Sequence, residues 1–126
     1  MDVLVVEDDQ SNRDLMVRRL ARHGIAATSA ASSREAIRAI GKTHPAIVLL
    51  DLGLPDESGV ETLKSIKRDP ATAGIRVIVT TSDGWARREC NDAGADAFLL
   101  KPIDAALLFA VMERFGVRAK RDTAAH

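Results

Sequence analysis

Residues 47–59, with the sequence IVLLDLGLPDESG, decide the fold of this chain. The stretch begins with four consecutive apolar residues, which is typical of a strand buried on both faces. A carboxylate, Asp51, follows the apolar run, and Ser58 lies three residues before Glu61. A serine followed by a glutamate at that spacing is a capping box, which begins a helix. The stretch therefore predicts a buried strand, a loop that follows a carboxylate, and a helix.

The same strand-then-helix arrangement recurs along the chain. The five predicted strands are Val3–Val6, Ile25–Thr28, Ile47–Leu50, Val77–Thr80 and Ala97–Leu100. Five such units in a row predict an α/β fold, with a doubly wound five-stranded parallel sheet between two layers of helices. In open sheets of this kind, ligands bind at the carboxyl ends of the strands, close to a switch in strand order.

Polar residues and glycines set the expected helix boundaries. The expected N-terminal caps are Ser11, Ser32 (in a second capping box, with Glu35), Ser58, Asp83 and Asp104, and the expected stops are Gly24, Gly41 and Gly94. On the first helix the apolar residues Leu15, Met16 and Leu20 are expected to share one face. On the last helix the inward-facing residues are expected to be Leu107, Leu108, Val111, Met112 and Phe115. We expect residues 1–116 to form one domain and residues 117–126 to be a polar tail.

Composition narrows the class of protein. The chain has 126 residues, of which 46% are hydrophobic and 29% charged, which suits one globular domain. Lys+Arg and Asp+Glu each number 18, and a net charge of zero argues against binding to nucleic acid or an anionic membrane. The single cysteine, Cys90, excludes an internal disulfide. With neither a signal peptide nor a membrane-length apolar run, we expect a cytoplasmic protein.

Chemically distinctive residues follow four of the predicted strands. They are the acidic run Glu7–Asp9, then Asp51, the hydroxyl run Thr80–Ser82, and Lys101. Several carboxylates in one pocket repel one another unless one takes a proton or a cation lies between them. A ligand set made only of oxygen favours Mg²⁺. The lysine and a threonine would then neutralise and hydrogen-bond a transferred phosphoryl group, with Asp51 as its natural acceptor.

Each of these groups also has a plain structural interpretation. An acidic run is typical of a solvated loop or a helix start, and a lone aspartate after a strand is typical of a turn. A threonine at a strand end and a single exposed lysine are equally ordinary. The combination at four separate strand ends favours the functional interpretation.

The sequence resembles the receiver domain of bacterial response regulators, and is most similar to the single-domain, CheY-type proteins. The resemblance extends from Val3 to about Phe115 and rests on four motifs. They are VLVVEDD at residues 3–9, IVLLDLGLPDESG at 47–59, VIVTTS at 77–82 and AGADAFLLKP at 93–102. It implies the (βα)5 flavodoxin-like fold and a phosphorylatable switch of two-component signalling. Such a switch is not an enzyme in the usual sense, because it catalyses only its own phosphotransfer and dephosphorylation.

The resemblance also implies a role for each matching residue. Asp51 would be the phosphoacceptor. The Mg²⁺ ligands would be Asp8, Glu7 through water, Asp51 and the Gly53 carbonyl. Lys101 would bind the phosphoryl group and precede a cis proline bond, Thr81 would be the switch hydroxyl, and Phe98 would be the aromatic switch. The implied partners are a histidine kinase or histidine phosphotransfer protein, and a downstream protein target.

Three positions depart from the common pattern of the family. Gly53 replaces a longer side chain at a place that controls access of water to the acyl phosphate. Phe98 lacks the hydroxyl of the commoner tyrosine. The segment 82–92 is about two residues short, so the fourth helix is expected to be short or displaced. Thr80 is an alternative to Thr81 as the switch, although the spacing from Asp51 favours Thr81.

A partner surface is predicted between the fourth and fifth helices. The hypothesis groups Trp85, Arg88 and Phe109, with Arg87 and Phe98 beside them, because aromatic and arginine side chains are favoured at interface hot spots. The chain would then be a monomer or a weak dimer through that face. The alternative is that Trp85 covers the start of a helix and that Phe109 is partly buried.

Other proteins share parts of this pattern. A flavodoxin-type flavin protein would need a Ser/Thr/Gly-rich loop after the first strand, where Glu7–Asp9 would repel a phosphate. A dehalogenase-type phosphohydrolase would need a second acid at the position of Gly53. A docking domain that is never phosphorylated would not need the acidic residues, the threonine and the lysine together. A DNA-binding output is not expected.

Overall fold

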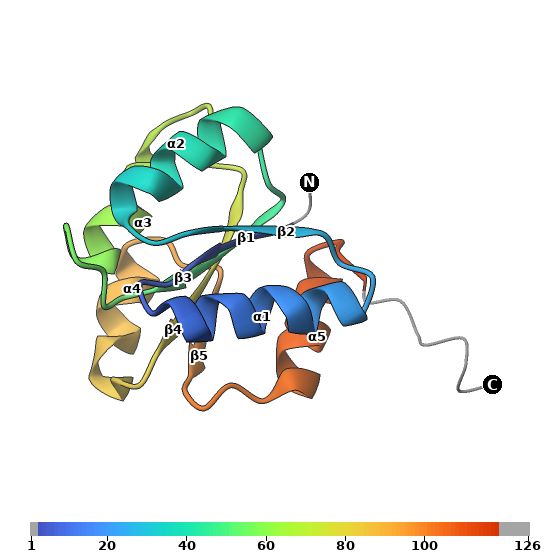
Figure 1. Ribbon diagram of the computed structural model, residues 1–126. Coiled ribbons are helices and arrows are strands. Elements are labelled where there is room, and N and C mark those ends of the chain that lie inside the picture. The colour runs from blue at the N-terminus through green and yellow to red at the C-terminus, as the bar shows by residue number, and fades with distance from the viewer. Residues whose placement is uncertain (1–2, 119–126) are drawn as a thin grey trace.

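The computed structural model describes residues 3–118, and its centre is a parallel five-stranded sheet with strand order β2-β1-β3-β4-β5 (Figure 1). The strands are β1 (Val3–Val6), β2 (Ala27–Ala30), β3 (Ile47–Asp51), β4 (Arg76–Thr81) and β5 (Ala97–Leu100). The helices are α1 (Gln10–Arg22), α2 (Ser33–Thr43), α3 (Gly59–Arg68), α4 (Arg87–Asp92) and α5 (Ala105–Arg114), with a 3₁₀ helix η1 (Gly84–Ala86) before α4. The predicted doubly wound α/β fold is confirmed.

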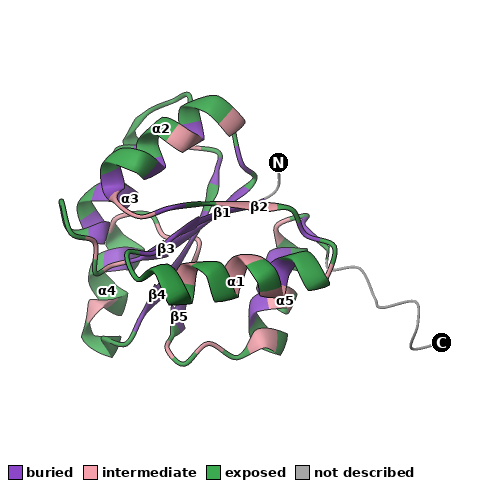
Figure 2. Cartoon of the chain, viewed as in Figure 1, coloured by how far each residue is buried: buried purple, intermediate pink, exposed green. Residues whose placement is uncertain are grey.

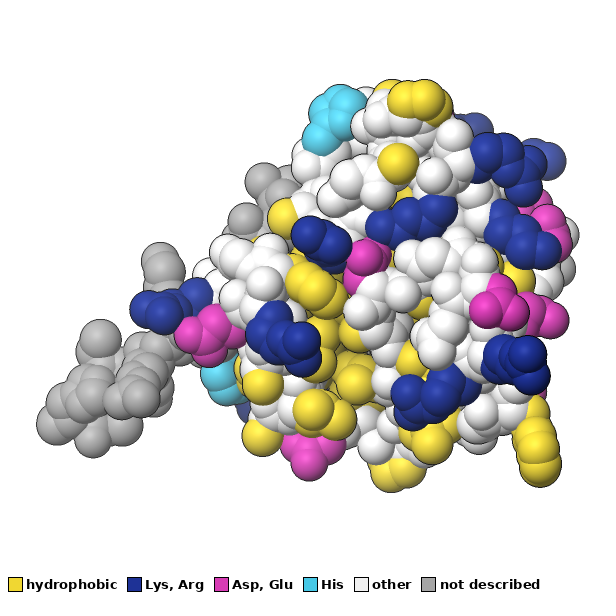
Figure 3. All heavy atoms as spheres, turned by 180° about the vertical axis from the view of Figure 1, so that it is seen from behind, with side chains coloured by type: hydrophobic (Ala, Val, Ile, Leu, Met, Phe, Trp, Pro, Cys, Tyr) yellow, Lys and Arg dark blue, Asp and Glu magenta, His cyan; other side chains and the backbone are white. Residues whose placement is uncertain are grey.

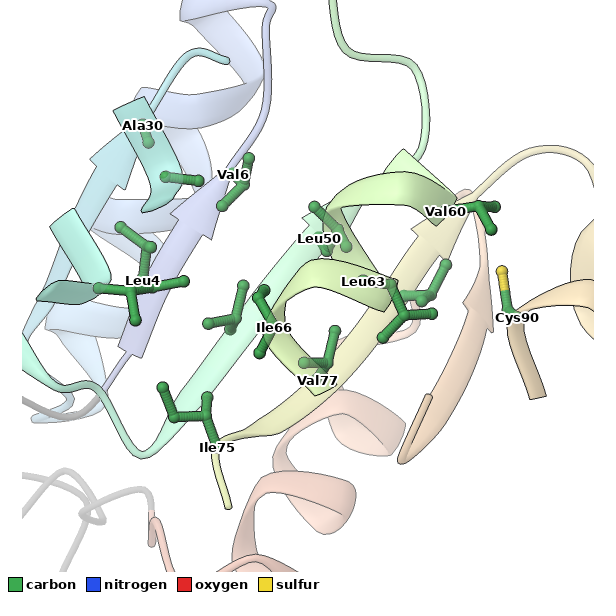
Figure 4. Packing of buried hydrophobic residues seen from close by; sticks show 14 of the residues in the cluster. Leu4, Val6, Ala30, Leu50, Val60, Leu63, Ile66, Ile75, Val77 and Cys90 are labelled. Atoms are coloured by element: carbon green, nitrogen blue, oxygen red, sulfur yellow. The ribbon is translucent and has the colours of Figure 1, made fainter. Parts of the chain in front are cut away.

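The buried strands divide the core into two layers. Their residues alternate between the faces of the sheet, so Leu4 and Leu50 pack under α2, α3 and α4, whereas Val5 and Leu49 pack against α1 and α5. Figure 4 shows the first layer, with Ile66 of α3 among the strand residues. Figure 2 shows the three central strands β1, β3 and β4 almost wholly buried, the edge strands β2 and β5 less so, and the helices largely exposed on their outer sides. This pattern explains the continuous apolar runs, because both faces of the sheet are covered.

Helix starts partly match the predicted caps. Ser32 accepts a hydrogen bond from the Glu35 amide at 3.2 Å, and Asp104 accepts one from the Leu107 amide at 3.2 Å, as expected. The assignment of Ser11 as the first cap is wrong, because Asp9 accepts from the Asn12 amide at 2.9 Å. An aspartate that accepts from the third residue after it caps a helix by itself, so α1 begins one residue before Ser11.

The predicted second strand is placed two residues too early. Gly24 has φ +74°, and the Ile25 amide donates to the Leu20 carbonyl, which closes the end of α1. Ile25 therefore packs in the core as part of the helix cap, and β2 starts at Ala27. Gly41 does not stop α2, which continues to Thr43 and ends where His44 adopts φ 46°.

Two leucines on the predicted apolar faces of the helices are exposed. Leu15 on α1 and Leu107 on α5 have exposed fractions of 52% and 51%. Val117, assigned by sequence to the tail, is buried, and its amide donates to the Met112 carbonyl at 3.0 Å. The rest of that predicted tail, 119–126, lies outside the described residues. No helix within residues 3–118 is both long and apolar enough to cross a membrane.

Candidate functional site

Three carboxylates meet at the carboxyl ends of the two central strands. Glu7 and Asp8 follow β1, and Asp51 ends the neighbouring strand β3. Carboxylate oxygens of the three residues lie within 4.8 Å of one another. Glu7 and Asp51 are only 7% and 9% exposed, whereas Asp8 is open to solvent. The sheet topology therefore produces the acidic cluster that the sequence predicts.

Lys101 brings the only positive charge in direct contact with these carboxylates among the described residues. Its Nζ lies 2.9 Å from Asp51 Oδ2 and 3.1 Å from Glu7 Oε1. The Lys101 backbone amide donates to the Thr81 carbonyl at 2.8 Å, which fixes the residue just beyond β5. The Lys101–Pro102 peptide bond is cis, as predicted. The amine thus bridges the two buried carboxylates.

Backbone contacts orient the two acidic loops. The Gly53 amide donates to Asp51 Oδ1 at 3.0 Å, so each oxygen of Asp51 has a partner. Arg13 on α1 donates to the carbonyl oxygens of Glu7 at 2.9 Å and Asp8 at 3.3 Å. Sequence patterns gave no signal for Arg13, because one of several arginines on a helix has no distinctive spacing.

Burial and charge separate the proton affinities of the two buried carboxyls. Burial, together with a hydrogen bond to Asp51 and its negative charge, raises the pKa of Glu7 to about 7. Burial also opposes ionisation of Asp51, but hydrogen bonds from Lys101, Glu7 and the Gly53 amide hold its pKa below the usual range. When the pair shares one proton, Glu7 therefore holds it, and Asp51 stays ionised.

The donor set fits a magnesium ion. All three side chains offer hard carboxylate oxygens, and the described residues around them offer no sulfur or imidazole ligand. Burial and the neighbouring Asp51 raise the pKa of Glu7 even beside Lys101, so additional positive charge would stabilise the ionised carboxylates. A divalent cation would supply that charge in place of the proton on Glu7.

The pKa of Glu7 predicts how stability depends on pH. Without divalent cations, we expect the free energy of unfolding to fall by about 3 kcal/mol as pH rises from 4.5 to 7. Over that range folded Glu7 keeps a proton that unfolded Glu7 has lost, so the unfolded state binds fewer protons and gains relative stability. The substitution Glu7→Gln should remove this dependence of the free energy of unfolding on pH. Urea unfolding, carried out with a chelator to remove divalent cations, measures it.

The matched control for that experiment is Glu57→Gln, which changes an exposed glutamate and should preserve the wild-type dependence on pH. Identical pH profiles for wild type and Glu7→Gln would contradict the assignment of the proton to Glu7.

The two threonines of β4 lie in different surroundings. Thr80 pairs with Asp51 across the sheet and lines a cavity of about 290 Å³ between α1 and the segment after β5. Thr81, one residue further, accepts a hydrogen bond from the Asp83 amide at 3.1 Å. Asp83 in turn caps η1 by accepting from the Trp85 amide at 2.9 Å. Thr81 is therefore connected to the η1–α4 segment, and Thr80 is not.

The fourth helix is short, as expected. It spans six residues after η1, in place of one longer helix. Phe98 on β5 is 7% exposed and lies under the Arg87 guanidinium of α4, at 4.8 Å from the ring centroid. Phe98 thus lies inside the protein in this structure.

The residues grouped as a partner surface do not all lie together. Trp85 is 96% exposed and Arg88 is exposed, so Trp85 does not cover a helix start. Phe109 is partly buried and packs against His23, the C-cap residue of α1, with ring centroids 4.3 Å apart, so it does not join them. Seen from behind, the molecule exposes hydrophobic side chains in a hollow flanked by Lys and Arg (Figure 3). Two further apolar side chains are also exposed: Leu100 on β5, at 47%, and Leu107 on α5, at 51%.

Comparison with known structures agrees with this architecture. A chemotaxis protein from Vibrio cholerae, CheY4, matches 90% of this chain and 97% of its own, with a TM-score of 0.83 and 24% identity. A CheY-like response regulator receiver domain protein from Methanospirillum hungatei matches 91% and 93%, with a TM-score of 0.82 and 27% identity. The fold is that of CheY-like receiver domains.

Sequence comparison shows the family. The family model of the response regulator receiver domain matches residues 3–113, so this chain belongs to that family of two-component systems. The two-component response regulator ORR12 of rice is 31% identical over 104 residues, covering 80% of this chain and 86% of that protein. The regulators PmrA of Pectobacterium parmentieri and KdpE of Mycobacterium tuberculosis are each 32% identical. This chain spans 46% and 53% of their lengths.

Proposed function

We propose that this protein is a magnesium-dependent phosphorylation switch and that Asp51 accepts the phosphoryl group. The observation that carries the proposal is the contact of Lys101 with both Asp51 and Glu7 beside exposed Asp8. An ionised carboxylate, a neighbouring ammonium group and a set of oxygen ligands are what in-line phosphoryl transfer to a side chain requires.

The donor is a phosphohistidine of a histidine kinase or phosphotransfer protein. An Asp51 carboxylate oxygen attacks phosphorus, an O–P bond forms, the P–N bond breaks, and the histidine nitrogen keeps the electron pair. Lys101 offsets negative charge on the phosphoryl oxygens. Asp8, Asp51, the Gly53 carbonyl and, through water, Glu7 would hold Mg²⁺, which would supply further positive charge to those oxygens.

The switch begins at Thr81. Its hydroxyl turns toward the phosphoryl group and gives up the hydrogen bond from the Asp83 amide. Because Asp83 caps η1, the turn that carries Trp85 then moves, and α4 with Arg87 over Phe98 follows. A downstream protein would read this change at Trp85 and Arg88, or a second copy would dimerise weakly there. The phosphohistidine donor and the downstream protein would both bind this chain in the cytoplasm.

The direct test is phosphorylation by a small acyl phosphate. We expect intact-mass spectrometry to show one added phosphoryl group in the presence of Mg²⁺. Chelator should reduce its formation by at least about tenfold, because the acidic cluster then lacks the charge that the transition state needs. Equal labelling with and without Mg²⁺ would contradict the proposed metal. Phosphotransfer from purified histidine kinases then identifies the donor.

A further inference from the structure

Asp56 makes a long-range contact, and the proposed function assigns no role to this residue. It lies in the exposed loop between β3 and α3, yet its side chain reaches the start of α2. Asp56 Oδ1 accepts from the Ser33 amide and Oδ2 from the Arg34 amide, both at 2.9 Å. These amides belong to the first turn of α2, where backbone donors have no partner within the helix. Asp56 thus caps a helix 22 residues before it in the chain.

The loop that carries Asp56 also carries Gly53. At its base, the Gly59 amide donates to the Leu52 carbonyl at 3.0 Å. A Cβ at Gly59 would lie 2.5 Å from the Leu52 Cα, so the two ends of the loop touch through backbone alone. The base of the loop is therefore fixed, and Asp56 fixes its tip.

The start of α2, which Asp56 caps, is itself packed into the core. Ala36 and Ile40 of α2 are buried in the first core layer. Below the cap, the Thr62 hydroxyl of α3 donates to the Ser33 hydroxyl at 2.8 Å, and both residues are buried. The N-terminus of α2 is thus hydrogen-bonded to α3. Asp56 adds two charge-assisted hydrogen bonds between the β3–α3 loop and the N-terminus of α2.

We propose that Asp56 is a positioning residue for the metal site, which it serves by holding the β3–α3 loop so that Gly53 stays beside Asp51. The inference rests on the proposed function, because it assumes that the Asp51 site binds Mg²⁺. The Ser33 and Arg34 amides also hold the pKa of Asp56 below its usual range, so the clamp keeps its charge at neutral pH. An asparagine has one acceptor oxygen and would keep one of the two hydrogen bonds, whereas alanine would keep neither.

The test compares graded variants of Asp56 with a variant of the other cap of α2. Calorimetric titration should show a Kd for Mg²⁺ raised about fivefold in Asp56→Ala and about twofold in Asp56→Asn, which is the scale of one or two lost hydrogen bonds. At saturating Mg²⁺ the rate of phosphorylation should return to the wild-type value. In metal-free protein, Asp56→Ala should speed amide hydrogen exchange in residues 52–58.

Ser32→Ala is the matched control, because Ser32 caps α2 through the Glu35 amide and does not touch the loop. It should weaken the helix and leave the Kd for Mg²⁺ unchanged. An unchanged Kd in Asp56→Ala, or an equal rise in Ser32→Ala, would overturn the inference while the proposed function stands. Failure of the wild-type protein to bind Mg²⁺ would overturn both.

Discussion

Asp51→Asn is expected to take up no phosphoryl group from an acyl phosphate or from a phosphorylated histidine protein, a loss of at least about a hundredfold. The asparagine amide lacks the negative charge that makes the carboxylate a nucleophile. Its side-chain oxygen can still accept from Lys101 or the Gly53 amide, so the fold should persist. Intact-mass spectrometry of the variant with and without Mg²⁺ measures the loss.

Asp8→Asn separates the nucleophile from the metal ligand. Asp8 is exposed and has no contact with Lys101, so this variant keeps Asp51 and loses one proposed ligand of Mg²⁺. Its labelling should recover as Mg²⁺ is raised, and that of Asp51→Asn should not. Label that survives in Asp51→Asn on any residue would contradict the assignment of the phosphoacceptor.

Lys101→Met should give the second large effect, on stability. In chelator at pH 8, we expect the free energy of unfolding to fall by about 2–3 kcal/mol, because two buried carboxylates lose the amine that neutralises them. The pKa of Lys101 is raised above 10.5, since hydrogen bonds to Asp51 and Glu7 outweigh the effect of burial. Its stabilising charge is therefore complete at pH 8. Urea unfolding measures the loss.

The same variant should lose less at pH 6, since Glu7, with a pKa of about 7, then carries a proton and repels Asp51 less. Mg²⁺ at pH 8 should restore part of the stability by replacing the missing charge. Lys64→Met is the control, because Lys64 pairs with Glu61 at 3.5 Å on the surface and should cost less than about 0.5 kcal/mol. An equal loss at both values of pH would contradict the coupling between Glu7 and Lys101.

The strand-end residues could be predicted because parallel sheets place all carboxyl ends at one edge. Glu7, Asp51 and Lys101 each follow a continuous apolar run, and that local pattern is enough to bring them together. The same reasoning placed β2 wrongly, because Ile25 is apolar for a different reason, as the hydrophobic contact of a helix cap.

Contacts between distant segments could not be predicted in this way. The exposure of Leu15 and Leu107 depends on which side of each helix meets the sheet, and apolar spacing defines that only to within a turn. Phe109 fell outside the predicted surface because α5 turns it toward His23 at the end of α1. The hydrogen bonds from the α2 amides to Asp56 could not be predicted from the neighbouring sequence, because an aspartate in a loop normally caps its own turn.

The bridge from Lys101 to Glu7 joins residues 94 positions apart, and the bridge to Asp51 joins residues 50 apart. Glu7 and Asp51 are synthesised before Lys101. The Lys101 amine can contact them only after β5 has been synthesised and has paired with β4. A nascent or partly unfolded chain therefore has the carboxylates without the amine that neutralises them. Under the proposed function, only copies whose folding is complete would take up a phosphoryl group.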